Sequence, residues 1–315
     1  MAATPKYQAN SGIMELRTYP SFYSKLFDEV RKKTEETPKE LDRFFSERNT
    51  NQETYKEGEV FNQLEVPARK SDTDRFELLQ APEGYNKTFT NVERGSAIMV
   101  TKRAVKAQKN KMLSQMITGL PESVANLQQL CQAKLFNDGF ASETTGDGSY
   151  VFATDHYYAD PAHGQYSNEA ASGGTFTTSS YLAGWLNMQK RKNQKGFPSR
   201  LIPGELLYPP DIHEAVMKVH GSTLYPDTSL NAKMPELFGA FEPVMGHWLN
   251  STTAWFIHAK GNENDKGFLW VWEIKPEYES ISDSMNPRLI MGKSVTESFS
   301  YGTLHSRDWY ANSGA

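Results

Sequence analysis

The sequence contains one cysteine, Cys131, in 315 residues, so an internal disulfide framework is excluded. It also lacks an apolar run approaching the about 18 residues that suggest a membrane helix. The longest apolar stretches, such as FLWVW at 268–272, have the length of a strand. The N-terminus, MAATPKYQANSG, has no charged region followed by an apolar run, so no export signal is indicated. These absences predict a chain that stays in a reducing, aqueous compartment such as a cytosol.

Positive charge is not in excess either. The net charge is −4 and the pI is about 6.0, so the basic footprint of a dedicated nucleic-acid reader is missing. The Gly-x-Ser-x-Gly and phosphate-loop motifs are also absent, which removes two common enzyme signatures. What remains is a polar chain, with a mean hydropathy of −0.63, in which 38% hydrophobic residues still suffice for a core.

Hydrophobic spacing predicts several elements. Phe22, Leu26 and Val30 recur every four residues, which predicts a helix over 21–33. Thr37 and Pro38 have the chemistry of a helix start, so a second helix is expected through PKELDRFFSERN. Further along, the composition predicts a helix at 179–193, a short one from Pro210, and strands in the segments around them.

The clearest helical pattern covers residues 102–136, where apolar residues repeat at spacings of three and four. Run straight, such a helix would be roughly 45–50 Å long, which resembles a spine more than an ordinary core helix. Gly119 and Pro121 fall inside the pattern, so a kink or a break is expected there. Cys131 lies on the apolar face, which indicates a small buried side chain and not a nucleophile.

Residues 52–84 are unlike their surroundings. Ten charged residues of both signs lie between Lys56 and Glu77, and PARKSDTD in the middle has the composition of a turn. We expect a long two-stranded hairpin that rests on another surface, since an isolated hairpin is marginal in water; a disordered linker is the alternative. Mixed charges suit a complementary protein surface. The candidates for intersubunit contact are Arg69, Lys70, Asp72, Asp74 and Arg75.

A dense polar cluster follows the long helix. Asp155, His156, Asp160 and His163 fall within nine consecutive positions, and this density suggests a metal or acid/base site. Metal ligands are usually held on rigid elements, however, and Asp160-Pro161 interrupts any regular element here. Aspartates in such segments also serve turns. We favour the structural interpretation and keep a metal-dependent hydrolase using Asp155, His156 and His163 as the alternative.

The order of these parts resembles a known family. The resemblance rests on YNKTFTNVERGSAIMVTKRAV (85–105), CQAKLFNDGF (131–140), FATDHYYADPAHGQYSN (152–168), SSYLAGWLNMQKRKNQKG followed by RLIPGELLYPPDI, and the closing SFSYGTLHSRDWY. Together they are similar to the major capsid (head) proteins of tailed bacteriophages, most of all to the Mu-like major head subunits.

The resemblance implies the α+β tailed-phage major capsid fold. Its expected parts are an N-terminal arm with helices (1–51), an extended hairpin loop (52–84), a peripheral domain with the spine helix (85–140), an axial domain (141–265) and return strands of the peripheral domain (266–315). It implies a structural shell protein that self-assembles through hexamers and pentamers into an icosahedral head around double-stranded DNA. Catalytic residues, cofactors and metals are not expected.

The same resemblance suggests partners. They are further copies of the chain, a separate scaffold protein, a portal, a decoration protein, and packaged DNA held non-specifically on the inner face, with no membrane. A scaffold on another chain is expected because only about 50 residues precede the hairpin. The chain would be synthesised in the host bacterial cytoplasm and would reside in the virion. A bacterial encapsulin-type compartment shell is the related alternative.

Overall fold

The computed structural model describes residues 19–37, 39–60, 83–101, 103, 110–158, 161–193, 196–199, 201–220, 241–260, 267–281 and 289–314. The chain divides into two compact units, each built from three separate segments. The smaller unit contains Met1–Pro38, Arg94–Asn126 and Pro276–Glu297, and the larger contains Lys39–Glu93, Leu127–Lys275 and Ser298–Ala315. The assignment of peripheral and axial domains stays a prediction.

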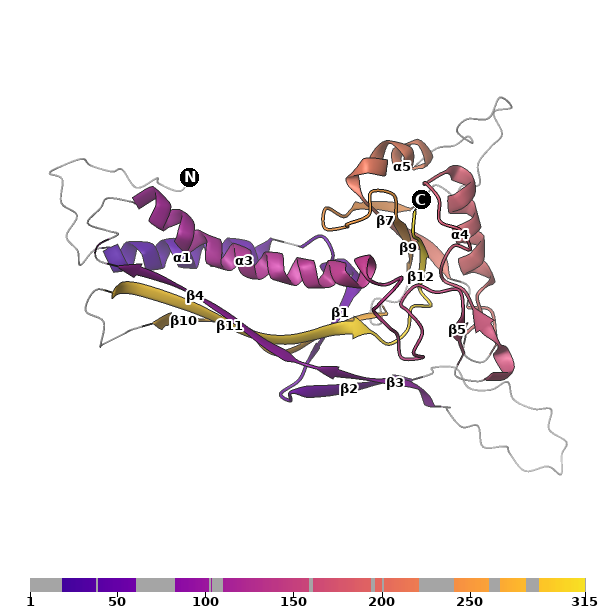
Figure 1. The fold of residues 1–315 in the computed structure, drawn as a ribbon, viewed down its shortest axis with the longest axis horizontal. Helices are drawn as coiled ribbons and strands as arrows, with labels where there is room; N and C mark the ends of the chain where they lie inside the picture. Colours follow the sequence, from indigo (N-terminus) through magenta and orange to yellow (C-terminus); the bar gives the residue numbers. More distant parts are fainter. Residues whose placement is uncertain are drawn as a thin grey trace, which may run out of the picture. The chain divides into compact units, whose positions relative to one another are not determined.

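Two helices and the strands beneath them make the core of the smaller unit (Figure 1). The helix expected at 21–33 is confirmed as α1 (Tyr19–Glu36), but its most buried side chains are Tyr23 and Phe27, one position along from the predicted stripe. They pack with residues of α3 (Asn110–Asn137), β4 (Val92–Thr101) and β11 (Leu289–Thr303). This core consists of Tyr23, Phe27, Val100, Leu113, Ile117, Leu120, Val124 and Val295.

The long helix is confirmed over Asn110–Asn137, and of the kink or break expected at Gly119 and Pro121 the break is wrong. Helix α3 runs from Asn110 to Asn137 and contains Pro121 in its interior. Proline removes one backbone donor and usually bends a helix. Here Ile117, Leu120 and Val124 are buried on both sides of Pro121, so tertiary packing stabilises the helix across the proline. The hydroxyl of Ser123 also donates to the carbonyl of Leu120 at 2.7 Å. Cys131 is buried, as predicted.

The second expected helix, over PKELDRFFSERN, is wrong. Its middle forms only a single 3-10 turn, η1 (Asp42–Phe44), and its end is strand β1 (Phe45–Asn49). Strand β1 pairs in parallel with β10 (Phe268–Ile281), with Phe45 opposite Phe268 and Asn49 opposite Trp272. Adjacent Phe44 and Phe45 have the spacing of neither a helix face nor one strand face. Both are buried, so long-range pairing overrode the local pattern.

The larger unit contains one whole sheet and part of a second. One has the strand order β12-β9-β7-β8 and consists of Trp309–Asn312, Trp255–Lys260, Ile202–Tyr208 and Glu242–Met245. Strands expected in the segments around the two later helices are therefore confirmed. Helices α4 (Thr178–Lys190) and α5 (His213–Val219) pack on one face of this sheet through a core that includes Tyr181, Val216 and Trp255. A capping box between Thr177 and Ser180 begins α4.

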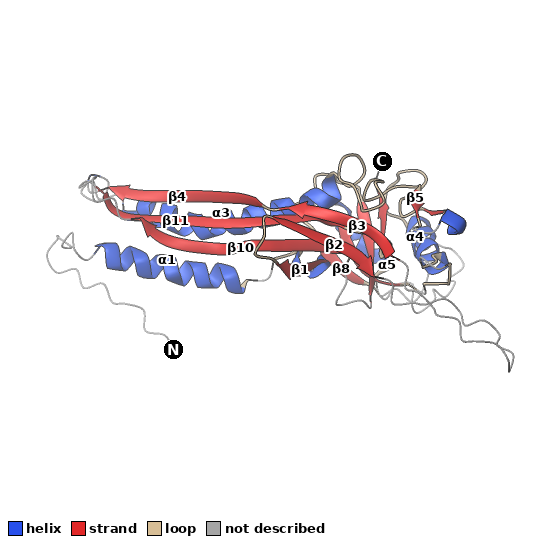
Figure 2. Cartoon of the chain, turned by 90° about the horizontal axis from the view of Figure 1, so that it is seen from below, coloured by secondary structure: helices blue, strands red, loops and turns tan. Residues whose placement is uncertain are grey.

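The other sheet has the order β1-β10-β11-β4, and its long strands run side by side in Figure 2. Within the larger unit, its aromatic residues share one core with the C-terminal part of α3 and the second face of the first sheet. The aromatic side chains of this core include Phe44, Phe136, Phe152, Phe256, Phe268, Trp270, Trp272 and Trp309. This aromatic core fixes the segment that follows α3.

The hairpin predicted at 52–84 is described only at its start, and the second strand of the observed ribbon lies mostly beyond residue 84. Strands β2 (Thr54–Val60) and β3 (Glu83–Thr90) pair antiparallel, with Thr54 opposite Thr90. Residues 61–82 lie outside the described part of the chain, and so does the expected turn. Within the ribbon Phe89 is buried, with Tyr55 packed on its small core. No described helix is long and apolar enough to cross a membrane.

Candidate functional site

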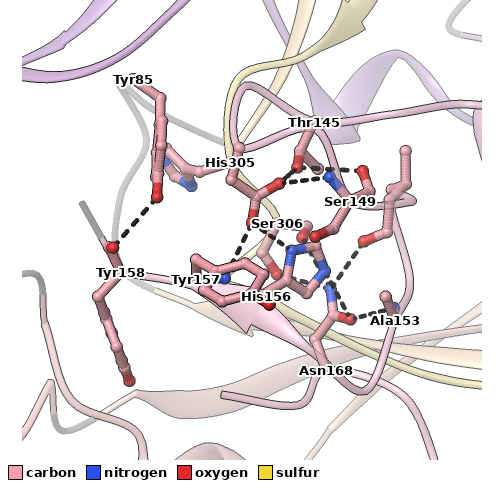
Figure 3. Close-up of polar contacts among 12 residues, drawn as sticks. Tyr85, Thr145, Ser149, Ala153, His156, Tyr157, Tyr158, Asn168, His305 and Ser306 are labelled. Carbon is pink, nitrogen blue, oxygen red and sulfur yellow. Dashed lines mark hydrogen bonds and ion pairs between the residues drawn. The ribbon is translucent and has the colours of Figure 1, made fainter. Parts of the chain in front are cut away.

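The polar segment after α3 contains a buried cluster centred on His156 (Figure 3). His156 lies in β5 (His156–Tyr157), which pairs antiparallel with β6 (Gln165–Tyr166). Its ring is 0% exposed and stacks on Tyr166, with ring centroids 5.0 Å apart and planes 16° apart. A buried imidazole needs partners at both nitrogens. The neighbouring loops supply them.

A tight turn supplies the first partner. Asp147 and Gly148 form the turn between Thr144 and Tyr150, and Gly148 takes a positive φ of 85°. One carboxylate oxygen of Asp147 accepts from the backbone N–H of Ser149 at 3.0 Å and from the hydroxyl of Thr145. The other lies 2.9 Å from His156 Nδ1. The turn therefore aims a carboxylate at the ring.

Asn168 supplies the second partner. Its Nδ2 donates to the carbonyl of Val151 at 2.8 Å and to the hydroxyl of Ser306 at 2.7 Å. Its Oδ1 accepts from the N–H of Ala153 at 2.8 Å. These bonds fix the orientation of the amide, and His156 Nε2 then lies 3.1 Å from Oδ1 and 3.3 Å from Ser306 Oγ. The cluster thus joins the turn at 147, the loop at 151–153 and the segment at 306.

Charge in and around the cluster is compensated. Burial by itself raises the pKa of Asp147, but the hydrogen bonds from His156 and Thr145 outweigh it and lower that pKa below its ordinary value. Burial raises the pKa of the Tyr166 hydroxyl, so this side chain stays neutral. Close by, burial lowers the pKa of Arg191 to about 10. Its guanidinium donates to the carbonyl of Trp309 at 2.5 Å and to that of Ser167 at 3.3 Å.

The predicted metal-ligand candidates are not brought together. Asp155 is exposed, whereas His156 is buried with both nitrogens bonded to protein atoms. His163 lies in η2 (Pro161–His163), where its ring contacts Tyr158 and is close to Gly196. Asp160 is outside the described residues. In the described part of the chain, no three His, Cys, Asp or Glu side chains form a group that could hold a metal. The cluster has the geometry of a structural clamp.

The five predicted contact residues, Arg69, Lys70, Asp72, Asp74 and Arg75, all fall within 61–82 and so outside the described residues. Sequence analysis identified His156 but missed Asp147, Asn168 and Ser306. The Asp-Gly pair at 147–148 was a usable turn signal. The other two residues follow no local pattern, since Ser306 meets the cluster from 150 residues away.

Solved structures that resemble this chain identify its fold. No protein-family model matches the sequence, and no curated protein matches it. The fold does match solved structures. A chain of the procapsid of bacteriophage JBD30 matches over 95% of this chain and 76% of its own, with a TM-score of 0.51 and 11% identity. The chain has the fold of tailed-phage capsid proteins. The predicted fold class is therefore confirmed.

Two further structures extend the likeness. The capsid of cyanophage P-SCSP1u matches over 87% of this chain and 88% of its own, with a TM-score of 0.52 and 10% identity. The SrpI encapsulin complex from Synechococcus elongatus PCC 7942 matches over 97% and 91%, with a TM-score of 0.50 and 11% identity. At such identities the likeness establishes the capsid fold alone, which phage heads and encapsulins share.

Proposed function

We propose that this chain is the major capsid protein of a tailed phage, a structural protein that self-assembles into the icosahedral head around the double-stranded DNA genome. One observation carries the proposal: the likeness to a phage procapsid protein extends over 95% of the chain, so little of the chain is left for another activity. The Mu-like group is the finer assignment, on the strength of the sequence resemblance.

The ribbon of β2 and β3 supports an assembly role. Two strands alone are marginally stable in water, and most side chains of this ribbon are at least partly exposed. The sequence between its two strands carries the mixed charges of Arg69, Lys70, Asp72, Asp74 and Arg75. A loop of this kind gains stability when it orders on a neighbouring subunit, because interface burial then offsets the lost chain entropy. We assign these five residues to intersubunit contacts.

The partners follow from the role. The chain contacts further copies of itself in hexamers and pentamers. Each copy needs several different contact surfaces, because every subunit of a closed shell has several neighbours. A separate scaffold protein, a portal and a decoration protein complete the set, and the packaged DNA lies against the inner face without sequence-specific contacts. The protein is made in the host bacterial cytoplasm and ends in the virion.

Assembly is the direct test. Full-length protein co-expressed with its scaffold is expected to form shells in electron micrographs and to sediment as large particles. Only a compact monomer under these conditions would refute the proposal. Deletion of residues 60–78 should leave a folded monomer and prevent stable shells. Changing only the five charged candidates to Ser keeps the length of the loop, so this variant tests the contacts of the side chains separately from the length of the loop.

A compartment shell of the encapsulin type is the second candidate, favoured by the likeness to the SrpI encapsulin complex. The contents of purified shells distinguish the two. A phage head holds DNA that resists external nuclease, and its gene lies near portal and terminase genes. A compartment holds a cargo protein encoded nearby.

A further inference from the structure

Strand β4 forms one margin of the sheet β1-β10-β11-β4 (Figure 2). It has ten residues, and in the described part of the chain no strand pairs with its outer edge. The outer edge of any such strand presents a row of backbone N–H and C=O groups that another strand can bind. Proteins usually protect these edges with charged side chains, proline, a short strand length or a covering segment.

The second part of β4 has none of these protections. Residues 95–101, GSAIMVT, contain neither a charge nor a proline. Val100 is buried and Ile98 packs on the same core beneath the helices, so Ala97 and Met99 point to the opposite face of the sheet. On that face Met99 is 54% exposed, and Ala97 is exposed as well. An uncharged, exposed edge of this length is suited to pairing with a further strand.

The other margins of the described sheets are protected. Strands β1, β8 and β12 have only four or five residues each. Strand β10 is paired with β1 only as far as Trp272, and its following residues include Pro276 and the charged Lys275, Glu277 and Glu279. Both strands of the ribbon, β2 and β3, contain lysine and glutamate. Among the described strands, β4 is therefore the one long margin with an unprotected stretch.

The charges that flank this stretch favour a second copy of β4 in the antiparallel orientation. Glu93 and Arg94 precede the stretch and cancel each other, whereas Lys102 and Arg103 follow it. Antiparallel self-pairing brings the neutral end of one copy to the basic end of the other. Parallel self-pairing would bring two basic ends together, which is repulsive. A two-fold axis produces the antiparallel arrangement, so the same edge serves both copies.

We propose that β4 pairs antiparallel with β4 of a second copy about a two-fold axis centred on Ile98. This register places the whole uncharged stretch 95–101 opposite itself. It also places the small Ala97 of each copy opposite the large Met99 of the other, on the exposed face. The sheet of the smaller unit then continues from one chain into the next. The contact belongs to the free chain, so it adds a two-fold contact to the proposed shell without depending on shell formation.

Disulfide formation tests the register. The full-length, unassembled Ala97→Cys/Met99→Cys variant should form a covalent dimer on mild oxidation, because the Cβ atoms of opposed residues lie about 4.5–5.5 Å apart. Cys131 is buried and does not compete. The control Glu277→Cys/Glu279→Cys has the same spacing on the protected margin of β10 and should stay monomeric. The absence of a covalent dimer at β4, or equal yields from the two variants, would overturn the proposal.

Sedimentation and amide hydrogen exchange test the contact without cysteines. The wild-type chain should show a monomer–dimer equilibrium, and the protection of amides in 95–101 should rise with protein concentration. Ala97→Lys should weaken dimerisation about tenfold, because each copy adds a positive charge to the interface, whereas Ala97→Ser should leave it nearly unchanged.

Two results contradict the proposal. One is a wild-type chain that stays monomeric at about 100 µM. The other is protection of 95–101 that does not depend on concentration, which would assign the edge to a segment of the same chain. Shells without dimers of the free chain would refute this contact alone, and dimers without shells would refute the proposed function alone.

Discussion

Replacing Asn168 by Ala should destabilise the larger unit far more than an average substitution. The amide makes contacts in three directions within the His156 cluster. Its loss leaves the N–H of Ala153, the carbonyl of Val151 and Nε2 of His156 without this partner, in a site that is 0% exposed at Asn168. Each stranded buried group costs about 1–3 kcal/mol. One trapped water can restore some of these bonds, so we expect about 3–5 kcal/mol in total.

Chemical and thermal unfolding of the full-length, unassembled chain measure this loss. For the larger unit, about 3 kcal/mol corresponds to a fall in Tm of roughly 6–12 °C. Asn51→Ala removes a similar amide from an exposed position and should change stability by no more than about 0.5 kcal/mol. A loss below about 1 kcal/mol for Asn168→Ala, indistinguishable from Asn51→Ala, would refute the view that this cluster clamps the segment after α3.

Three further results are expected. Because the pKa of Asp147 is lowered in the fold, this carboxylate contributes stability at pH values above the ordinary aspartate pKa of about 3.9, and the contribution is lost as the pH falls through the lower folded pKa. Urea midpoints should be measured from pH 6 to 3. Asp147→Asn should remove this part of the pH dependence, and the exposed control Asp155→Asn should retain it. Gly119→Ala should raise the free energy of unfolding by about 0.5–1 kcal/mol, because a Cβ at this position of α3 meets nothing within 4 Å. Gly139→Ala places a Cβ 2.3 Å from the carbonyl of Leu135, so it should clearly lower the Tm in a thermal scan. Cys131 should resist a thiol reagent in the folded chain and react after denaturation; rapid modification of native protein would contradict its burial.

Local patterns located α1, α3, α4, α5 and most strands, but they also predicted a helix over PKELDRFFSERN that does not form. The repeat in α3 includes the buried Ile117, Leu120 and Val124, whereas in α1 the most buried residues lie one position from the repeat, so the period located that helix without identifying its buried face. Strand β1 could not be found this way, because its pairing partner Phe268 lies more than 200 residues along the chain and both neighbouring phenylalanines are buried. The uninterrupted course of α3 through Pro121 likewise depends on packing that no local rule contains.

The buried cluster shows the same limit at the level of a site. Density in Asp and His drew attention to 155–163, yet only His156 of that group is part of the described hydrogen-bond network. Its partners Asp147, Asn168 and Ser306 are ordinary turn and loop residues whose role exists only in three dimensions. A polar cluster in a sequence therefore indicates where buried hydrogen bonds occur, without identifying the residues that complete them.

The division of the smaller unit among three segments has a consequence for biosynthesis. Helix α1 is synthesised well before all of its packing partners, because Tyr278 and Val295 of the same core follow about 250 residues later. At a translation rate of about 5–20 residues per second, these partners are synthesised roughly 13–50 s after Phe27. During that interval the apolar face of α1 is available to other nascent chains and to chaperones. The yield of this protein in the cell should therefore depend on protection during translation as well as on the stability of the finished fold.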